Sequence, residues 1–266
     1  MKRLASLSTI GALIFLTLMS FKPAPRFRAL VLSESGGHHI AYSRAAKVWL
    51  DQLAADSSFV IDYINNTDKI DVDFLQQYQL FIQLDYPPYG WKDKAAKAFE
   101  SYINEGKGGW IGFHHATLLG EFDGFGIWPW FYKFMGQIRF KDYIGSFASG
   151  TVRAEDTLHP VLKNVPKAFS IKTEEWYVYD KNPRSHVHVL ANVDENSYSP
   201  ASGKKMGDHP VIWTNRDYKA RNVYIFMGHS PDLFDNEDYK TLFRNAIFWA
   251  AGPYIPLKMP GAPNLE

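Results

Sequence analysis

The sequence predicts an α/β fold: a mostly parallel sheet with helices on both faces and a β-rich addition in the C-terminal half. Up to Gly120, short apolar runs alternate with segments whose apolar residues recur at helical spacing. This alternation is typical of parallel sheets, because each helix returns the chain to the edge from which the next strand starts. After Gly120 the pattern changes to short strand-like runs separated by polar turns, which predict the β-rich addition.

The elements of the first half follow from this alternation. The predicted strands are mainly apolar segments, at residues 27–32, 59–64, 80–84 and 109–114. The predicted helices lie between them, at residues 41–55, 71–78 and 91–105. Gly106 follows the third helix directly and is a natural helix stop.

The second half contains fewer helices. A short helix is expected at residues 128–134, and a last helix at residues 238–251 ends before Gly252 and Pro253. The strand-like runs of this half are short and bounded by polar turns, at residues 151–154, 174–179, 186–191, 211–214 and 223–227.

Composition excludes several classes of protein. The chain has 266 residues and a formal net charge of +1, and this balance argues against a nucleic-acid partner, since phosphate neutralisation needs clustered Lys and Arg. It has no cysteine, which excludes disulfides, cysteine-ligated zinc and a cysteine nucleophile. No dinucleotide-binding G-x-G-x-x-G motif follows the first strand, and Walker and G-x-S-x-G motifs are absent, so no bound nucleotide is expected.

The N-terminal segment at residues 1–20 has the layout of a secretory signal peptide. Lys2 and Arg3 precede an apolar run at residues 4–20. The alternative is an uncleaved anchor, because the run is near the lower limit of about 17–25 residues for a membrane span. Cleavage would deliver a protein without a membrane segment to the periplasm or cell envelope. Composition divides the rest into a tether at 21–26, the α/β domain at 27–252 and an extended tail at 253–266.

Five of the nine histidines directly follow predicted strands. His38 and His39 come after the first strand, His114 and His115 after the fourth, and His229 after the last. In a parallel sheet, ligands bind beyond the carboxyl ends of the strands. We therefore expect these imidazoles to meet at one edge of the sheet.

Imidazoles at such an edge serve in proton transfer or as metal ligands. Proton transfer needs one histidine held by a carboxylate, and the candidates are Glu174, Glu175 and Asp85. The alternative for the adjacent pair Glu174 and Glu175 is an exposed position on an edge strand.

A metal site would use two or three of His38, His39, His114 and His229, together with a carboxylate such as Glu175. Neutral imidazoles and carboxylates suit zinc or another divalent ion. The sequence contains no local ligand motif such as H-E-x-x-H, so the prediction depends on the fold bringing the residues together.

Aromatic residues offer flat surfaces for a sugar ring. Trp91, Trp128, Trp130, Phe131 and Tyr132 form an aromatic-rich group, and aromatic faces pack well against the C–H groups of sugars. The alternative is that some of them pack beneath the long loop in which they lie.

Several motifs, in order along the chain, resemble those of the trehalose-utilisation (ThuA-like) family. They are Gly108-Gly109-Trp110-Ile111-Gly112-Phe113-His114-His115-Ala116, His159-Pro160, Val165-Pro166 with Phe169, Glu174-Glu175-Trp176-Tyr177, Pro210-Val211-Ile212-Trp213, Arg221 with Gly228-His229, and Phe248-Trp249-Ala250. The resemblance covers about residues 27–252.

The resemblance implies a flavodoxin-like fold of the class I glutamine amidotransferase type, and a role in sugar or polyol metabolism linked to trehalose and 3-keto-sugars. In the amidotransferases a cysteine nucleophile follows the central strand. Here His114-His115 occupies that place, so glutaminase activity is excluded. By family likeness, His38, His114, Glu175 and His229 are expected to form the site.

Two functions follow from these residues. The first is a hydrolase or lyase for a sugar or 3-keto-sugar, with His114 or His229 as acid or base, Glu175 as orienting group and Arg221 holding an anionic or carbonyl oxygen. The residues expected to bind its carbohydrate substrate are His38, His39, His115, Trp128, Trp130 and Arg221. The second is a non-catalytic carbohydrate-binding or partner module on the same scaffold.

Overall fold

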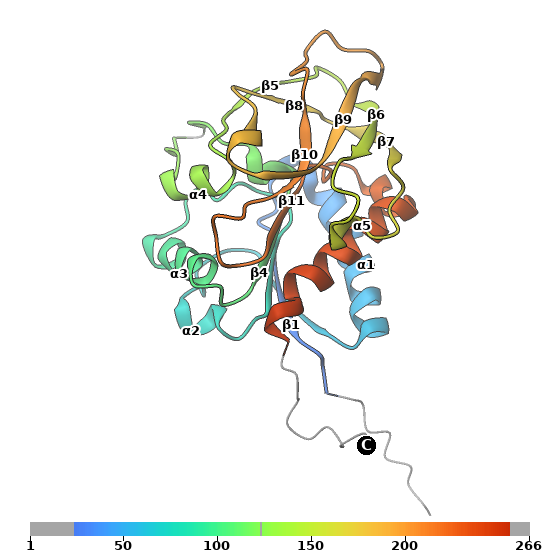
Figure 1. Cartoon of the computed structure of the whole chain (residues 1–266). Helices are drawn as coiled ribbons and strands as arrows, with labels where there is room; N and C mark the ends of the chain where they lie inside the picture. The colour runs from blue at the N-terminus through green and yellow to red at the C-terminus, as the bar shows by residue number, and fades with distance from the viewer. Residues whose placement is uncertain (1–23, 123, 256–266) are drawn as a thin grey trace, which may run out of the picture.

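The computed structural model describes residues 24–122 and 124–255 (Figure 1). The expected signal peptide at 1–20 lies outside these residues, as do residues 21–23 of the tether and residues 256–266 of the tail. At the start of the described chain, the Arg26 backbone N–H donates to the Ser58 carbonyl at 2.7 Å.

The strands of the described residues form two sheets. The larger has nine strands in the order β2-β1-β3-β4-β11-β10-β9-β6-β7, and the smaller pairs β5 with β8. The strands are β1 (Arg28–Leu32), β2 (Val60–Ile64), β3 (Leu80–Gln83), β4 (Gly109–Phe113), β5 (Phe140–Tyr143), β6 (Ala148–Ala154), β7 (Ala168–Glu174), β8 (Tyr177–Tyr179), β9 (His188–Ser199), β10 (Pro210–Thr214) and β11 (Asn222–Ile225).

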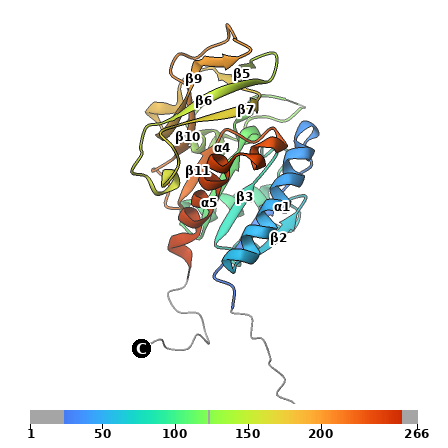
Figure 2. The ribbon, with the colours of Figure 1, turned by 90° about the vertical axis from the view of Figure 1, so that its right-hand side faces the viewer.

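Helices cover both faces of the parallel part of the large sheet. In Figure 1, α2, α3 and α4 lie on one side of the strands, and α1 and α5 lie on the other, side by side in Figure 2. The α-helices are α1 (Ile40–Ser57), α2 (Val72–Leu75), α3 (Asp93–Asn104), α4 (Pro129–Phe134) and α5 (Glu237–Ala251). Short 3-10 helices include η1 (Gly37–His39) and η2 (His114–Thr117).

The large sheet changes direction in its middle. β1 pairs in parallel with β2 and β3, β3 with β4, and β4 with β11. From β11 onward every pairing is antiparallel, through β10, β9, β6 and β7. The predicted parallel sheet with helices on both faces and a β-rich C-terminal addition is confirmed. The carboxyl ends of β1, β3, β4 and β11 consequently lie at one edge.

The centre of the core follows from the apolar runs read in the sequence. All residues of β3, β4 and β11 are buried, as expected for parallel strands covered on both faces. Helix α5 packs very closely on β4, because a Cβ added at Gly109 would lie 2.3 Å from the Ala250 carbonyl oxygen. This approach requires glycine at the start of β4.

Most predicted elements are confirmed, and the main differences lie in the second half. Residues 174–179 are not one strand: β7 ends at Glu174 in the large sheet, and β8 begins at Tyr177 in the small one. Strand β9 extends for 12 residues, well beyond the predicted 186–191. Strand β5 and the first part of β7 were not predicted, because their alternating exposure leaves no continuous apolar run.

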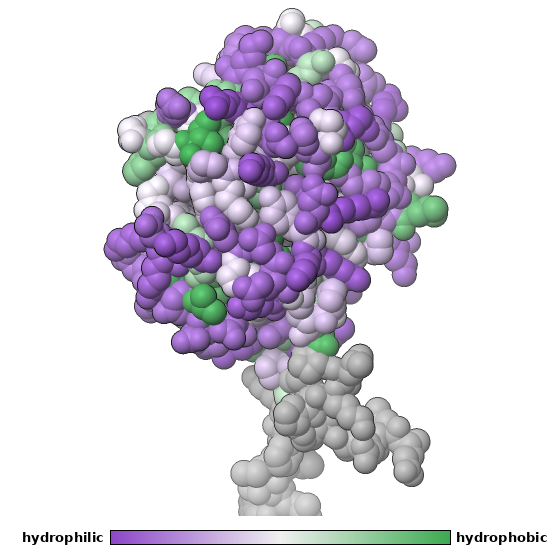
Figure 3. Space-filling view, turned by 60° about the vertical axis from the view of Figure 1, so that its left-hand side comes forward, coloured by the Kyte–Doolittle hydropathy of each residue, from purple (hydrophilic) through white to green (hydrophobic). Residues whose placement is uncertain are grey.

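The described surface is mainly polar. The face seen in Figure 3 is largely hydrophilic, with small separate apolar areas. No helix within residues 24–122 and 124–255 combines the length and the hydropathy of a membrane span.

A buried carboxylate fixes the connection between β9 and β10. Glu195 is 6% exposed and accepts the backbone N–H groups of Met206 at 2.6 Å and Gly207 at 2.7 Å, with Nδ1 of His209 at 3.0 Å. Burial raises its pKa, but the hydrogen bonds from His209 and the two backbone groups outweigh burial, and the net pKa of Glu195 is lowered.

Replacing Glu195 with alanine is expected to lower the free energy of unfolding by about 2 kcal/mol, since it leaves buried N–H groups without an acceptor. Because the pKa is lowered on folding, this contribution is present above the ordinary pKa of the carboxyl and is lost as the pH falls through the folded value. Urea unfolding at pH 7 and pH 4 measures it. The control is Asp194→Ala, which removes an ion pair with exposed Arg153 and a hydrogen bond from the Asn196 N–H, and which should cost much less stability. Equal losses in the two variants would contradict the assignment.

Candidate functional site

Four imidazoles meet beyond the carboxyl ends of the parallel strands. His39 lies in η1 after β1, His114 and His115 open η2 after β4, and His229 follows β11. Nε2 of His39 is 2.8 Å from Nδ1 of His229, which is 3.4 Å from Nε2 of His114. The ring centres of His39 and His115 are 3.7 Å apart. We call these four residues the histidine cluster.

His38 lies at the rim of the cluster. Its neighbour His39 is buried, whereas His38 is exposed. It is close enough to interact electrostatically with Glu175 and His229. Of the two adjacent histidines, His39 therefore belongs to the buried cluster and His38 faces solvent beside it.

Two adjacent glutamates border the cluster. Glu174, at the end of β7, is fully buried, and its Oε1 lies 3.4 Å from Nδ1 of His114. Glu175 is 23% exposed, and its Oε2 lies 3.8 Å from Nε2 of His114 and 3.7 Å from Nδ1 of His229. The break between β7 and β8 directs both side chains toward the histidines, so the predicted alternative of an exposed edge strand does not hold for Glu174.

Glu174 also holds the backbone around His229. Its Oε1 accepts the N–H of Glu175 at 2.9 Å, and its Oε2 accepts the N–H of Gly228 at 3.0 Å. Burial raises the pKa of Glu174 to about 8, although hydrogen bonds from the backbone N–H groups of Glu175, Gly228 and His229 favour its ionised form. This carboxyl group is thus a fixed bridge between the ends of β7 and β11.

The backbone of His114 is held in an uncommon conformation. Its φ is +31°, outside the regions that L-residues prefer, at a sharp turn from β4 into η2. The Tyr224 hydroxyl donates to the His114 carbonyl at 2.9 Å, and Thr117 Oγ1 donates to it at 3.0 Å. Strain of this kind is typical of functional positions, where the surrounding structure enforces it.

Backbone carbonyls determine which ring nitrogens carry protons. Nδ1 of His114 lies 3.2 Å from the Phe226 carbonyl oxygen, and Nδ1 of His115 lies 3.1 Å from the Asp85 carbonyl oxygen. A carbonyl oxygen only accepts, so both Nδ1 atoms must donate. In neutral rings, Nε2 of each residue then carries a lone pair.

The cluster is neutral at physiological pH. Burial lowers the pKa of His114 to about 3 and that of His229 to about 4, and it also lowers the pKa values of His39 and His115. Burial raises the pKa of Glu175. Neutral imidazoles with fixed lone pairs are weak bases and good metal ligands.

The structure offers two overlapping sets of possible metal ligands. One is His39, His114 and His115, and the other is His114, Glu175 and His229. Within each set, one ligand atom from every residue lies within 4.8 Å of the others. The expected convergence of histidines from separate strand ends is therefore present in the fold.

Two aromatic side chains outside the predicted site also border the cluster. The Tyr177 ring centre lies 4.4 Å from that of His114, and its hydroxyl hydrogen-bonds to Glu175. Phe147 is 49% exposed, and its ring centre lies 4.7 Å from that of His229. Tyr177 ends the acidic-aromatic motif that begins at Glu174, whereas no local pattern marks Phe147.

Three residues expected to bind substrate lie away from the cluster. Arg221 precedes β11, whereas His229 follows it, so the two residues are at opposite edges of the sheet. The Arg221 guanidinium donates to the Trp249 carbonyl at 2.9 Å. Trp128 donates to Glu100 at 3.0 Å and lines a separate hollow of about 380 Å³. Trp130 packs against Phe99, Phe134 and Tyr218.

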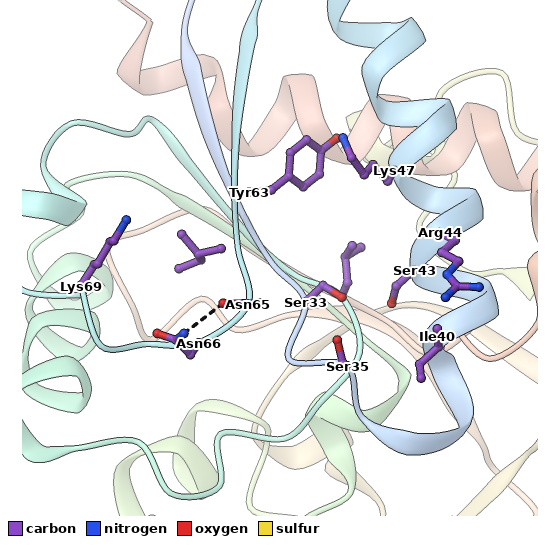
Figure 4. A pocket seen from close by; sticks show the side chains of 12 residues that line it. Ser33, Ser35, Ile40, Ser43, Arg44, Lys47, Tyr63, Asn65, Asn66 and Lys69 are labelled. Carbon is purple, nitrogen blue, oxygen red and sulfur yellow. Dashed lines mark hydrogen bonds between the residues drawn. The ribbon is translucent and has the colours of Figure 1, made fainter.

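A larger hollow lies near the cluster, between α1 and the ends of β1 and β2 (Figure 4). Its volume is about 500 Å³. Its lining carries hydroxyl, amide and cationic side chains, among them Ser33, Ser35, Ser43, Arg44, Asn65, Asn66 and Lys69. Asp85 connects the two sites: its carboxylate accepts from Ser33 at 2.7 Å and Ser43 at 3.0 Å, and its carbonyl accepts from His115.

The chain matches the sequence model of a known protein family. The sequence model of the ThuA family, described as trehalose utilisation, matches residues 28–250. No curated protein is significantly similar in sequence to the chain.

Solved structures share the fold. A ThuA-like protein from Bacteroides uniformis is 30% identical, with a TM-score of 0.77 over 86% of this chain and 93% of that one. A ThuA-like protein from Parabacteroides merdae is 19% identical, with a TM-score of 0.64 over 89% and 94%. A GMP synthase protein from Thermoplasma acidophilum, 11% identical with a TM-score of 0.53 over 85% and 94%, shares the amidotransferase-like fold. By the match to the family over most of its length, the chain belongs to the ThuA (trehalose utilisation) family.

Proposed function

We propose that the protein is an enzyme of carbohydrate metabolism that acts on the carbonyl group of an oxidised sugar, such as a 3-keto-glycoside. The observation that carries the proposal is the convergence of four neutral imidazoles and two glutamates at the carboxyl ends of β1, β4 and β11. Gathering so many polar groups in a buried place costs stability, which is characteristic of functional sites. Membership of the trehalose-utilisation family supports a carbohydrate substrate.

A ketone at C3 gives such a site a defined reaction. The carbonyl acidifies the neighbouring C2–H bond, so a base can remove this proton and leave an enolate. The enolate then re-forms the carbonyl at C3, a double bond forms between C1 and C2, and the bond from C1 to the glycosidic oxygen breaks. The released oxygen takes up a proton. The products are an unsaturated keto-sugar and the released alcohol, and addition of water to the former completes a net hydrolysis.

His38 is the proposed base for this proton. It is exposed at the rim of the cluster, within electrostatic reach of Glu175 and His229. Its exposure leaves the imidazole accessible to a bound substrate, and an imidazole is a common general base. Burial lowers the pKa values of His114 and His229, so the role proposed for these two residues is at the carbonyl oxygen.

The hollow beside α1 is the proposed binding site for the sugar. Serine hydroxyls and asparagine amides in its lining, among them Ser35, Asn65 and Asn66, match the hydroxyl groups of a carbohydrate. Its link to the cluster through Asp85 would align the sugar with the histidines.

Assays on paired substrates test the proposal. Wild-type protein is expected to release the alcohol from 3-keto-glucosides and not from the parent glucosides, whose C2–H is not acidified. His38→Ala should lower kcat at least tenfold. The matched control is His186→Ala, because His186 contacts Gln137 and lies outside the cluster.

The alternative is a non-catalytic carbohydrate-binding module on the same scaffold. Binding of the keto-sugar without any turnover would favour the module and contradict the enzyme. Binding that survives alanine at His114 and His229 but is lost with Trp128→Ala would assign recognition to the hollow beside Trp128.

We further propose that the protein is exported. Lys2 and Arg3 followed by the apolar run at residues 4–20 support a cleaved signal peptide. Cell fractionation with N-terminal sequencing of the recovered protein tests this, and recovery of an uncleaved chain in the cytoplasm would contradict it.

A further inference from the structure

We infer that the histidine cluster binds one divalent transition-metal ion of the zinc type, with His114 Nε2, His229 Nδ1 and Glu175 Oε2 as ligands. The inference deepens the proposed function: it relies on that function for the role of the ion, and on the geometry of the site for its binding.

The distances between the three atoms suit one ion. They are 3.4 Å for the two nitrogens, and 3.8 and 3.7 Å from these nitrogens to the carboxylate oxygen. Zinc bonds of about 2.0–2.1 Å in tetrahedral geometry require ligand atoms about 3.4 Å apart. Shifts of a few tenths of an ångström would bring all three atoms to bonding distance.

A count of protons supports a cation. His114 Nε2 carries a lone pair, because its Nδ1 donates to the Phe226 carbonyl. Nδ1 of His229 faces both this atom and His39 Nε2, at 3.4 and 2.8 Å. Between neutral rings, each of these contacts needs a proton. If His229 Nδ1 carries the proton, it can donate a good hydrogen bond to only one of the two neighbouring nitrogens. If His39 Nε2 instead donates to His229 Nδ1, no hydrogen-bond donor faces His114 Nε2. A metal ion takes up the facing lone pairs of His114 Nε2 and His229 Nδ1 together, and a His39 ring protonated at Nδ1 then turns its own Nε2 lone pair toward the same place.

The surroundings of His114 are those of a metal ligand. Histidine ligands commonly donate their second N–H to a carbonyl or carboxylate, which fixes the ring. Nδ1 of His114 does so toward Phe226 O and lies 3.4 Å from Glu174 Oε1. His39 is fully buried, and its Nδ1 has no hydrogen-bond partner among the described residues, so the cluster contains polar atoms that the protein alone leaves unsatisfied.

The ligand set leaves room for substrate. Two imidazoles and one carboxylate are the pattern of catalytic zinc sites, in which a further position stays open. Glu175 is 23% exposed and His229 10%, so solvent reaches the site from their side, next to His38 and Phe147. An ion there would accept the ketone oxygen as a Lewis acid while His38 removes the proton.

Metal titration of the tag-free, chelator-treated protein tests the inference. We expect one Zn²⁺ per chain by calorimetry and elemental analysis, with a dissociation constant in the micromolar range or below. Glu175→Gln and His229→Gln should each weaken binding at least tenfold. Glu175 is partly exposed, and glutamine has nearly the same side-chain shape as glutamate, so circular dichroism of Glu175→Gln should show an intact fold. His186→Gln is the control and should bind as the wild type does.

The outcomes separate the metal from the function. Binding that is absent, or that is equal in the wild type and Glu175→Gln, overturns the metal site. Turnover of a 3-keto-glucoside by fully metal-free protein overturns the role of the ion and leaves the proposed function standing. Stoichiometric zinc binding that Glu175→Gln weakens, without turnover of any keto-sugar, supports the metal site and contradicts the function.

Discussion

Replacing His114 with alanine is expected to lower the turnover of a 3-keto-glucoside by more than about a hundredfold, the usual scale for loss of a group at the reacting centre. His114 Nε2 faces both His229 Nδ1 and Glu175 Oε2. The substitution therefore removes the nitrogen that lies next to both other proposed metal ligands. Single-turnover kinetics with saturating substrate measures the loss. His114 is 1% exposed, so alanine also leaves a small internal cavity.

Two controls separate chemistry from folding in this variant. Thermal unfolding reports the cost of the cavity, and His186→Ala reports the effect of removing an imidazole elsewhere. Added zinc should not restore the activity of His114→Ala. Turnover equal to that of the wild type would refute a catalytic role for the cluster.

Replacing Glu174 with alanine is expected to have the largest effect on stability, about 3–4 kcal/mol in the free energy of unfolding. The change leaves the buried N–H groups of Glu175 and Gly228 without an acceptor. It also releases the segment that carries His229. We therefore expect kcat to fall at least tenfold even at temperatures where the variant is folded.

Chemical denaturation together with kinetics at low temperature measures both effects. The control is Glu121→Ala, an exposed glutamate, which should change neither quantity measurably. A loss of stability with unchanged kcat would make Glu174 a purely structural residue. Unchanged stability would mean that water replaces its carboxylate, contrary to its complete burial.

The parallel half of the fold could be predicted because each element carries a local signal. Residues 80–84 and 109–114 are mainly apolar runs, and β3 and β4 are buried on both faces. The antiparallel half was predicted less well. The polar stretch at residues 192–199 becomes strand because it pairs with β6. β7 and β8 belong to different sheets because β7 pairs with β6 and β8 pairs with β5. These partners lie far away along the chain, so the local sequence does not predict the division.

The site was predictable where it depends on strand direction. His39, His114 and His229 all follow strands that run parallel, so they reach one edge. The same rule places Arg221 at the other edge, because it precedes β11 instead of following it. Glu174 was among the carboxylates expected to hold a histidine, and it lies beside His114. Its bond to the Gly228 N–H could not be predicted, since this contact depends on how β7 meets the end of β11.

The position of β11 bears on how the protein is made. It lies between β4 and β10 although it is the last strand synthesised, and the His39–His229 contact joins residues 190 positions apart. A growing polypeptide therefore cannot assemble the cluster until residue 229 has left the ribosome. Pairings this distant form slowly. A chain interrupted before residue 229 would lack one imidazole of the cluster, and so the proposed chemistry, even with β1 to β4 already synthesised.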